Sequence, residues 1–307
     1  MKVVFIGKSH EFSMVPLKAI MGGHDVVGII ESAPRLKTSK ASRFLSNLSS
    51  RLFDRQSLWN LARKIKVPYM YLTRENQAEL VSFLKRIQPD ILCVASLTQL
   101  LKKEVLQIPK YGAINLHPSM LPKYHGPYPW FWQYYHFEKE WGITVHVIDE
   151  GQDTGPIVKQ ESFALETGRD IADAIRIVSP IGARLMLESI NEIEEGTAVF
   201  NPQPPHSYPK ARIIRRDEKL IDWQQWSIER VWHVMRGTYP WLDAVEYPRH
   251  IKGTWRIREF ERCACDDTPG RLYKDDKGYY VAHKEGKVRL DLEQTSFDRI
   301  RKYFKSS

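Results

Sequence analysis

Short apolar runs that end at glycine or at polar residues mark the first part of the chain as a set of buried strands. Residues 2–7, 25–30 and 90–95 are mostly apolar, and each run has the length of one strand. Helical patterns over 16–21 and 77–87 separate these runs. Since strands that alternate with helices form parallel sheets, the pattern predicts an α/β fold with a doubly wound parallel sheet.

Two more strands and a long helix follow. Residues 112–117 predict another buried strand, and the alternation over 142–148 predicts a strand that is covered on one face. A helical pattern then runs from about residue 170 to 195, and Pro180 within it predicts a break or a kink. In open sheets of this kind ligands bind at the carboxyl ends of the strands, so we expect the functional residues there.

The chain changes character at residues 201–209, where four prolines predict a linker. Beyond it lie a helical pattern and several short strand patterns separated by turn residues, at 227–236, 253–258, 270–273, 278–282 and 287–292. Short strands at such spacing predict a small β-barrel. The organisation is therefore an α/β domain over 1–200, the linker, and a barrel domain over 210–307.

The composition indicates a compact globular protein. With 307 residues, of which 42% are hydrophobic and 27% charged, the chain can form one large or two ordinary compact domains. No apolar run reaches the roughly 18 to 20 residues of a membrane span, and the first is too short for a signal peptide, so we expect a cytoplasmic protein. Cys93, Cys263 and Cys265 are too few for a disulfide framework or a four-ligand zinc site.

The formal net charge of +9 favours an anionic partner. Within residues 33–66, only Asp54 opposes a series of basic side chains, which are Arg35, Lys37, Lys40, Arg43, Arg51, Arg55, Arg63, Lys64 and Lys66. Two interpretations remain open for this segment. It forms either a solvated loop and helix face or a contact surface for phosphates.

Several common motifs are absent. Gly7-Lys8-Ser9 resembles the end of a phosphate-binding P-loop, but Lys2 stands where that loop needs its first glycine. No Gly-x-Gly-x-x-Gly follows the first strand, so hydride transfer from a dinucleotide loses its main support. Zinc-protease and serine-hydrolase motifs are missing as well.

Asn115 and His117 lie near the end of the strand predicted over 112–117, and strand alternation puts both on one side. An amide donor and an imidazole can then converge on one carbonyl, while a carboxylate such as Asp153 orients the imidazole and favours its protonated form. These are parts for acyl transfer, with Asn115 as oxyanion donor, His117 as acid/base and Asp153 as orienter. Taken singly, such residues also serve as caps or turn residues, and the pattern alone leaves that open.

The motifs NLHPSMLP at 115–122 and DEGQDTGP at 149–156, in this order and at this separation, resemble those of the folate-dependent formyltransferase family. The family includes glycinamide ribonucleotide, methionyl-tRNA and amino-sugar formyltransferases. The resemblance implies a Rossmann-like formyltransferase domain over 1–200, with 10-formyltetrahydrofolate as donor and no metal. It also implies that Asn115, His117 and Asp153 match the catalytic triad.

The same resemblance implies where the folate binds. The pterin is expected against residues 92–101 and 148–153, held largely by backbone groups. The residues expected to line it are Leu92, Ile148, Asp149, Glu150, Gly151 and Gln152.

Residues 220–223, 239–241 and 268–270 resemble the C-terminal OB-like domain of methionyl-tRNA formyltransferases, which the formyltransferase for UDP-linked 4-amino-4-deoxyarabinose shares. Together with the basic segment, this favours initiator methionyl-tRNA as the partner, bound through its phosphates. A nucleotide-linked amino sugar is the alternative acceptor. A third hypothesis, a folate- or RNA-binding protein without catalysis, conflicts with the intact triad.

Two departures from the family pattern concern the acceptor. The basic loop at 32–40 lacks the Gly-Arg-Gly stretch typical of methionyl-tRNA formyltransferases, and residues 123–126 read Lys-Tyr-His-Gly where the family often has Arg-Gly. An aromatic run follows at 128–132. Its rings either line an acceptor pocket by stacking on a base or sugar, or belong to the core, and the core interpretation is favoured.

Overall fold

The computed structural model describes residues 1–33, 57–204, 208–215, 217–239, 242, 245 and 254–293. The chain forms two compact units. The first contains Met1–Pro129, Glu140–Ala164 and Ala172–Arg212, and the second contains Trp130–Lys139, Leu165–Ile171 and Ile213–Ser307. The second unit thus takes two segments from the part of the sequence that precedes the proline-rich linker.

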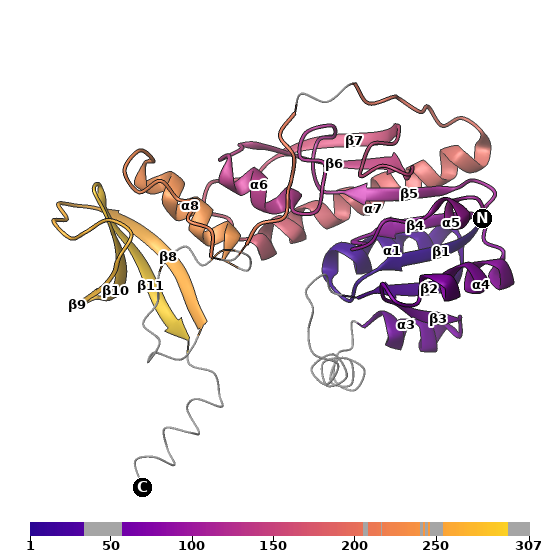
Figure 1. The fold of residues 1–307 in the computed structure, drawn as a ribbon, viewed down its shortest axis with the longest axis horizontal. Helices are drawn as coiled ribbons and strands as arrows, with labels where there is room; N and C mark the ends of the chain where they lie inside the picture. The colour runs from indigo at the N-terminus through magenta and orange to yellow at the C-terminus, as the bar shows by residue number, and fades with distance from the viewer. Residues whose placement is uncertain are drawn as a thin grey trace, which may run out of the picture. The chain divides into compact units, whose positions relative to one another are not determined.

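The first unit is built on a seven-stranded sheet with the order β3-β2-β1-β4-β5-β6-β7 (Figure 1). Its strands are β1 (Lys2–Gly7), β2 (Asp25–Ser32), β3 (Tyr69–Leu72), β4 (Ile91–Ala95), β5 (Ala113–His117), β6 (Glu140–Val147) and β7 (Ile157–Ala164). The predicted α/β fold is confirmed, and β1 to β5 pair in parallel as expected. The strand order reverses between β1 and β4, the position at which such sheets bind ligands.

The last two strands differ from the prediction. β6 runs antiparallel to β5, and β7 antiparallel to β6, so the sheet is mixed. Only residues 148–156 connect β6 to β7, and this is shorter than the dozen or so residues that a parallel crossover requires. The turn between these two strands carries Asp153, so the antiparallel hairpin brings Asp153 back beside β5.

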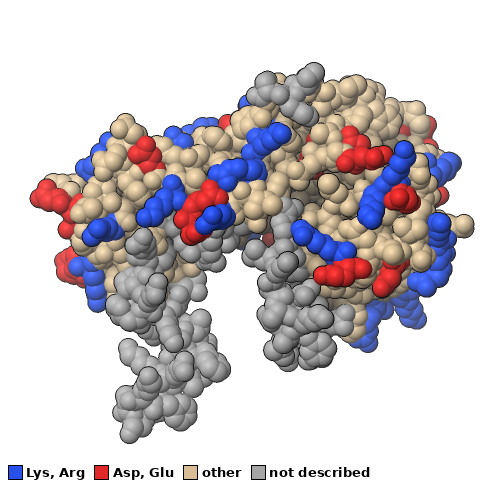
Figure 2. Space-filling model, in the orientation of Figure 1, with Lys and Arg blue, Asp and Glu red and all other residues tan. Residues whose placement is uncertain are grey.

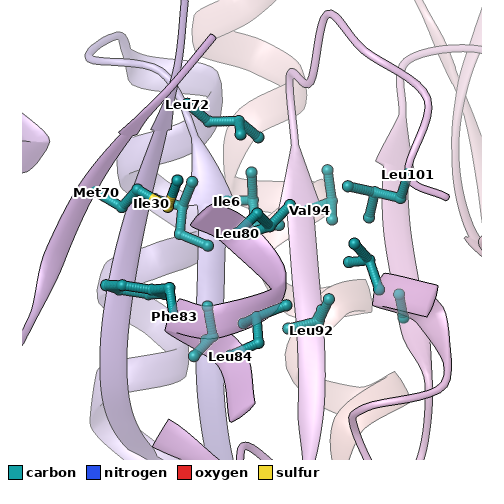
Figure 3. Packing of buried hydrophobic residues seen from close by; sticks show 13 residues of the cluster. Ile6, Ile30, Met70, Leu72, Leu80, Phe83, Leu84, Leu92, Val94 and Leu101 are labelled. Carbon is teal, nitrogen blue, oxygen red and sulfur yellow. The ribbon is translucent and has the colours of Figure 1, made fainter. Parts of the chain in front are cut away.

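Helices cover the sheet, and their apolar faces form its core. They are α1 (Glu11–Gly23), α3 (Leu58–Ile65), α4 (Gln77–Ile87), α5 (Lys103–Leu106) and α7 (Ile171–Glu195). Leu80, Phe83 and Leu84 of α4 pack against Leu92 and Val94 of β4 in one buried cluster (Figure 3). Periodicity in the sequence does not indicate α3, β3 or β7, because each is short or alternates weakly in hydrophobicity.

The sequence predicts a break or a kink at Pro180. Helix α7 is continuous from Ile171 to Glu195, so the break is wrong. The missing N–H of a proline removes one hydrogen bond, which the tertiary packing of a long helix can offset. Gly182 shows how close that packing is. A Cβ atom at Gly182 would lie 2.6 Å from Ile143 Cδ1 and 2.8 Å from Leu116 Cδ2, so α7 rests almost directly on β5 and β6.

The described part of the second unit contains α6 (Pro129–Tyr135, from Trp130 onward), α8 (Ile228–Thr238) and a four-stranded antiparallel sheet of order β8-β11-β10-β9 (Figure 1). The strands are β8 (Thr254–Arg262), β9 (Leu272–Asp275), β10 (Gly278–His283) and β11 (Gly286–Glu293). Ile228, Val231 and Met235 of α8 pack on one face of this sheet against Trp255 and Val288. The predicted short strands are therefore present, as a second, antiparallel sheet.

Charged side chains of both signs are interspersed on the face shown in Figure 2. Most of the basic segment, residues 34–56, lies outside the described residues. Arg63 and Lys64 occupy the last turn of α3 and Lys66 caps its end, where positive charge stabilises the helix dipole. Among the described helices, none combines the length and apolar character that a bilayer crossing requires.

Candidate active site

Asn115 and His117 project from the last residues of β5, between parallel β4 and antiparallel β6. Side chains two residues apart in a strand share a face, so both lie on the same side of the sheet, as the sequence predicts. The register pairs Asn115 with His146 and His117 with Thr144. β6 therefore brings a second histidine next to the predicted pair.

His117 is buried and has a defined neighbour at each ring nitrogen. Its Nε2 lies 3.0 Å from the carbonyl oxygen of Tyr124, and its Nδ1 lies 3.7 Å from Asp153 Oδ1. A carbonyl oxygen only accepts hydrogen bonds, so Nε2 carries a proton. Nδ1 is therefore the nitrogen that can gain or lose a proton while the bond to Tyr124 persists, and it is the one that faces the carboxylate.

The Asp153 carboxylate is held at one oxygen and faces two imidazole rings with the other. Oδ2 accepts a hydrogen bond of 2.8 Å from the Gly126 N–H, while Oδ1 lies 3.7 Å from both His117 Nδ1 and His146 Nε2. Only 18% of its side chain is exposed. The structure thus brings Asp153 against His117, as the two motifs predict.

His146 is the residue of this group that the sequence did not single out. Its Nδ1 lies 2.8 Å from the Val147 carbonyl oxygen, and its Nε2 lies 3.1 Å from Asn115 Nδ2. Burial, opposed in part by the nearby Asp153 carboxylate, lowers the pKa of His146 to about 4. The ring is therefore neutral at pH 7, with its proton on Nδ1, and Nε2 accepts from the Asn115 amide.

The loop that follows β5 is tied to β6 and to itself. Thr144 Oγ1 donates to the Ser119 carbonyl oxygen at 2.7 Å and accepts from the Leu121 N–H at 3.2 Å. Ser119 Oγ in turn donates to the Lys123 carbonyl oxygen at 2.7 Å. These bonds fix the path from His117 to Tyr124, whose carbonyl oxygen holds the imidazole.

Residues 149–152 are exposed and form a turn of fixed shape between β6 and β7. The Asp149 carboxylate accepts from the Gly151 N–H at 3.0 Å and from Thr154 Oγ1 at 2.8 Å, so it stabilises its own turn. Glu150 lies 3.8 Å from Lys103, with both side chains exposed. Backbone groups of the turn, rather than the Asp149 carboxylate, are thus the groups best placed to meet a ligand.

The predicted folate-lining residues differ in exposure. Leu92 is fully buried in the core cluster, to which Ile148 is a partly buried neighbour. Gln152 is exposed in the turn after β6. The predicted set therefore combines a buried apolar layer with an exposed polar turn.

The aromatic run after the site loop is largely core. Phe131 is fully buried and Trp132 is 7% exposed, and the two rings meet edge to face with their centroids 5.2 Å apart. Tyr128 and Trp130 are half-buried. The core interpretation therefore holds for Phe131 and Trp132.

The arrangement combines an amide donor, an imidazole and a carboxylate at the carboxyl end of a central strand. These groups can stabilise an oxyanion and move a proton, which are the two requirements of acyl transfer to an amine. Among the described residues, no group of three or more His, Cys, Asp or Glu side chains is placed to hold a metal ion.

Known proteins share the sequence pattern of this chain. Residues 1–185 match the model of the formyl transferase family. The methionyl-tRNA formyltransferase of Thermodesulfovibrio yellowstonii is 28% identical over 298 residues, which cover 97% of this chain and 92% of that protein. That of Pelotomaculum thermopropionicum is 29% identical, covering 98% and 93%.

A solved structure shares the fold. The N-formyltransferase of Helicobacter canadensis, in complex with folinic acid and dTDP-3-aminofucose, superposes with a TM-score of 0.62. It is 19% identical and covers 96% of this chain and 100% of its own. At this identity the likeness concerns the fold alone.

Proposed function

The chain belongs to the formyl transferase family, and we propose that it is a cytoplasmic enzyme that transfers a formyl group from 10-formyltetrahydrofolate to the amino group of initiator methionyl-tRNA. The observation that carries the chemistry is the cluster of Asn115, His117 and Asp153, with His117 Nδ1 3.7 Å from the carboxylate. The acceptor is supported by the similarity to methionyl-tRNA formyltransferases over nearly the whole chain.

The first step is attack of a neutral primary amine on the formyl carbon, which places negative charge on the carbonyl oxygen. The Asn115 amide has two N–H groups, one of which is directed to His146 Nε2. The second can donate to the oxyanion, and protonated His117 donates to it from Nδ1. Donors fixed in advance favour the transition state over the ground state, which is the source of the rate increase.

Collapse of the tetrahedral intermediate requires a proton to leave the attacking nitrogen and another to reach the departing folate nitrogen. Asp153 stabilises the His117 imidazolium through Oδ1, while the Gly126 N–H holds Oδ2. In this proposal the carboxylate also helps, through a water molecule, to move the proton from the attacking nitrogen to the departing folate nitrogen. The products are the N-formyl acceptor and tetrahydrofolate.

The residues expected at the folate fit such a ligand. Leu97, Leu101 and Ile148 belong to one apolar cluster, which offers a flat ring a surface to pack on. The exposed turn at 149–152 adds backbone donors and acceptors for the polar edge of a pterin. We therefore propose 92–101 and 148–153, including Asp149, Glu150, Gly151 and Gln152, as the folate-facing regions. Leu92 was expected there too, but its side chain is fully buried and supports the apolar layer from within the core.

We also propose a separate role for each part of the chain. Residues 1–200 supply catalysis, 201–209 the linker, and 210–307 an OB-like barrel domain that contributes to binding the tRNA. Lys and Arg side chains of this domain and of the segment 33–66 are the proposed phosphate contacts, so binding should weaken as salt increases.

The test is formyl transfer by the purified protein from 10-formyltetrahydrofolate to methionyl-tRNA, with Asn115→Ala as control. Rapid transfer by the wild type that is lost in the variant supports the proposal. Transfer to a dTDP- or UDP-linked amino sugar, with none to methionyl-tRNA, would overturn the acceptor and support the amino-sugar alternative. Transfer that is unchanged in Asn115→Ala would overturn the proposed role of Asn115.

A further inference from the structure

Two loops that position the triad are each hydrogen-bonded to residues in or next to the proline-rich linker. The described linker residues are 201–204 at one end and 208–209 at the other, where residues 210 and 211 continue the chain. The first end contacts the turn that carries Asp153. The second end contacts the loop that carries Tyr124 and Gly126, the partners of His117 and Asp153.

At the first end, Gln203 clamps the Asp153 backbone. Its Nε2 donates to the Asp153 carbonyl oxygen at 2.9 Å and to the Gly155 carbonyl oxygen at 2.7 Å. Both protons of the amide group are thus used on carbonyls that flank Thr154. Asn201 continues the attachment by exchanging two backbone hydrogen bonds, of 2.8 and 2.9 Å, with Ile157 at the start of β7.

Asp153 needs such support because its backbone is in the left-handed region, with φ of 57°. That conformation costs a residue other than glycine roughly 1 kcal/mol or more, and it persists where the surroundings hold it. Hydrogen bonds on either side of Thr154 hold the turn in this conformation. The conformation directs the Asp153 side chain toward His117 instead of away from the sheet.

At the second end, the linker pairs with the loop after β5. The Tyr124 N–H donates to the Pro209 carbonyl oxygen at 2.9 Å, and the Ala211 N–H donates to the His125 carbonyl oxygen at 2.8 Å. Gly126 lies against the same segment, since a Cβ atom there would be 2.8 Å from the Ala211 carbonyl oxygen. The carbonyl of Tyr124 and the N–H of Gly126 are therefore placed by the linker.

The backbone of Gln203 is restricted as well. Pro204 follows Gln203 and restricts its backbone to extended conformations, which limits the freedom of the clamp.

We propose that the linker is a positioning element of the active site, and that Gln203 is the positioning residue through which it sets the Asp153 carboxylate. The inference rests on the proposed role of Asp153. Gln203 contacts the backbone of Asp153 and no reacting atom, so its effect reaches the reaction only through the carboxylate.

The test is a double-mutant cycle between Gln203→Met and Asp153→Asn. Gln203→Met keeps the length of the side chain but removes both N–H donors. We expect the kcat of this variant to fall roughly 10- to 100-fold, which is the effect of moving a catalytic group, here the Asp153 carboxylate, by about 1 Å. The KM for both substrates should change less than about threefold. In the Asp153→Asn background the same change should cost less than about twofold, because the carboxylate it positions is already gone.

A matched control separates positioning from stability. Asn76 also fixes its own turn with its side chain, accepting from the Thr73 N–H at 2.7 Å and donating to the Tyr71 carbonyl oxygen at 2.9 Å. Asn76→Leu should lower Tm by an amount similar to Gln203→Met but leave kcat unchanged. Wild-type kcat in Gln203→Met, or an equal loss in both Asp153 backgrounds, would overturn the inference.

Hydrogen exchange supplies a readout that does not depend on which amine accepts the formyl group. The Gly126 N–H donates to Asp153 Oδ2, so a displaced carboxylate should raise the exchange rate of this amide. We expect faster exchange in Gln203→Met and Asp153→Asn, and the wild-type rate in Asn76→Leu. Wild-type exchange in Gln203→Met contradicts the positioning role, whereas full activity of Asp153→Asn alone would contradict the proposed triad.

Discussion

Asn115 and His146 face each other across the antiparallel pair of β5 and β6, with 3.1 Å between Asn115 Nδ2 and His146 Nε2. The neutral His146 ring donates from Nδ1 to the Val147 carbonyl oxygen, so its Nε2 can only accept. If the Asn115 amide were turned the other way, its Oδ1 would face the lone pair of His146 Nε2, and two acceptors would repel each other. The histidine thus fixes which end of the amide is available as an oxyanion donor.

Replacing His146 should therefore reduce catalysis without removing any group that touches the substrate. We expect His146→Leu to lower kcat by roughly 100-fold, the effect of losing or misdirecting one oxyanion donor. His146→Gln, whose amide oxygen can take the place of Nε2, should retain most of the activity. Equal activities for the Leu and Gln variants would show that the acceptor at Nε2 does not orient Asn115.

His117 should be essential for turnover but not for binding of the folate. We expect His117→Ala to lower kcat by roughly 10²- to 10⁴-fold, because it removes the proton donor and one oxyanion contact. The Kd for 10-formyltetrahydrofolate, measured by calorimetry, should stay nearly unchanged. Near-normal turnover in this variant would refute the assigned role.

Much of the sheet could be predicted from the sequence because buried strands keep their apolar runs wherever they pair. Strand direction was harder. Nothing in the alternation over 142–148 distinguishes a parallel from an antiparallel neighbour, and the short connection to β7 became evident only when β7 itself was located. The polar edge strand β7 has no continuous apolar run, so periodicity missed it.

The residues of the site could be predicted only where they depend on a single strand or on a motif. Asn115 and His117 share a face because strand alternation requires it, and the second motif supplied Asp153. His146 stayed hidden, since its place opposite Asn115 depends on the register between two strands, which one sequence does not specify. The role of Gln203 was hidden for a different reason. Proline content identifies a linker but not which loops it contacts.

Any side chain at Gly126 should destabilise the protein. Its φ of 120° lies in a region that residues with a Cβ atom rarely adopt, and that atom would also lie 2.8 Å from the Ala211 carbonyl oxygen. We expect Gly126→Ala to cost roughly 1 to 3 kcal/mol of stability and to lower kcat, because the N–H that holds Asp153 would shift.

Gly112→Ala is the control for that experiment. Gly112 also has a positive φ, of 69°, but a Cβ atom there meets nothing within 4 Å. Tm should fall in both variants, whereas kcat should fall only in Gly126→Ala. An unchanged kcat in Gly126→Ala would show that the bond to Asp153 survives the substitution.

His233 should make the second unit sensitive to acid. The Gly168 N–H donates to His233 Nδ1 at 2.9 Å, and Nε2 is buried with no partner among the described residues. Burial, with a smaller contribution from Lys139, lowers the pKa of His233 to about 4. Below pH 6.5 the unfolded chain therefore binds a proton that the folded chain does not. The contribution of neutral His233 to the free energy of unfolding is therefore fully present above about pH 6.5. It is lost as the pH falls toward 4, by up to about 3 kcal/mol.

The measurement is the free energy of unfolding in urea between pH 7.5 and 4.5, for the wild type and for His233→Asn. The Asn amide oxygen can accept from the Gly168 N–H as Nδ1 does, but it does not titrate in this range. His10 and His146, whose pKa values are also lowered to about 4, are present in both proteins, so their contributions cancel. We expect the variant to be less stable at pH 7.5, because a buried ring is lost, but to lose less stability on acidification. Parallel pH profiles for the two proteins would contradict the assignment to His233.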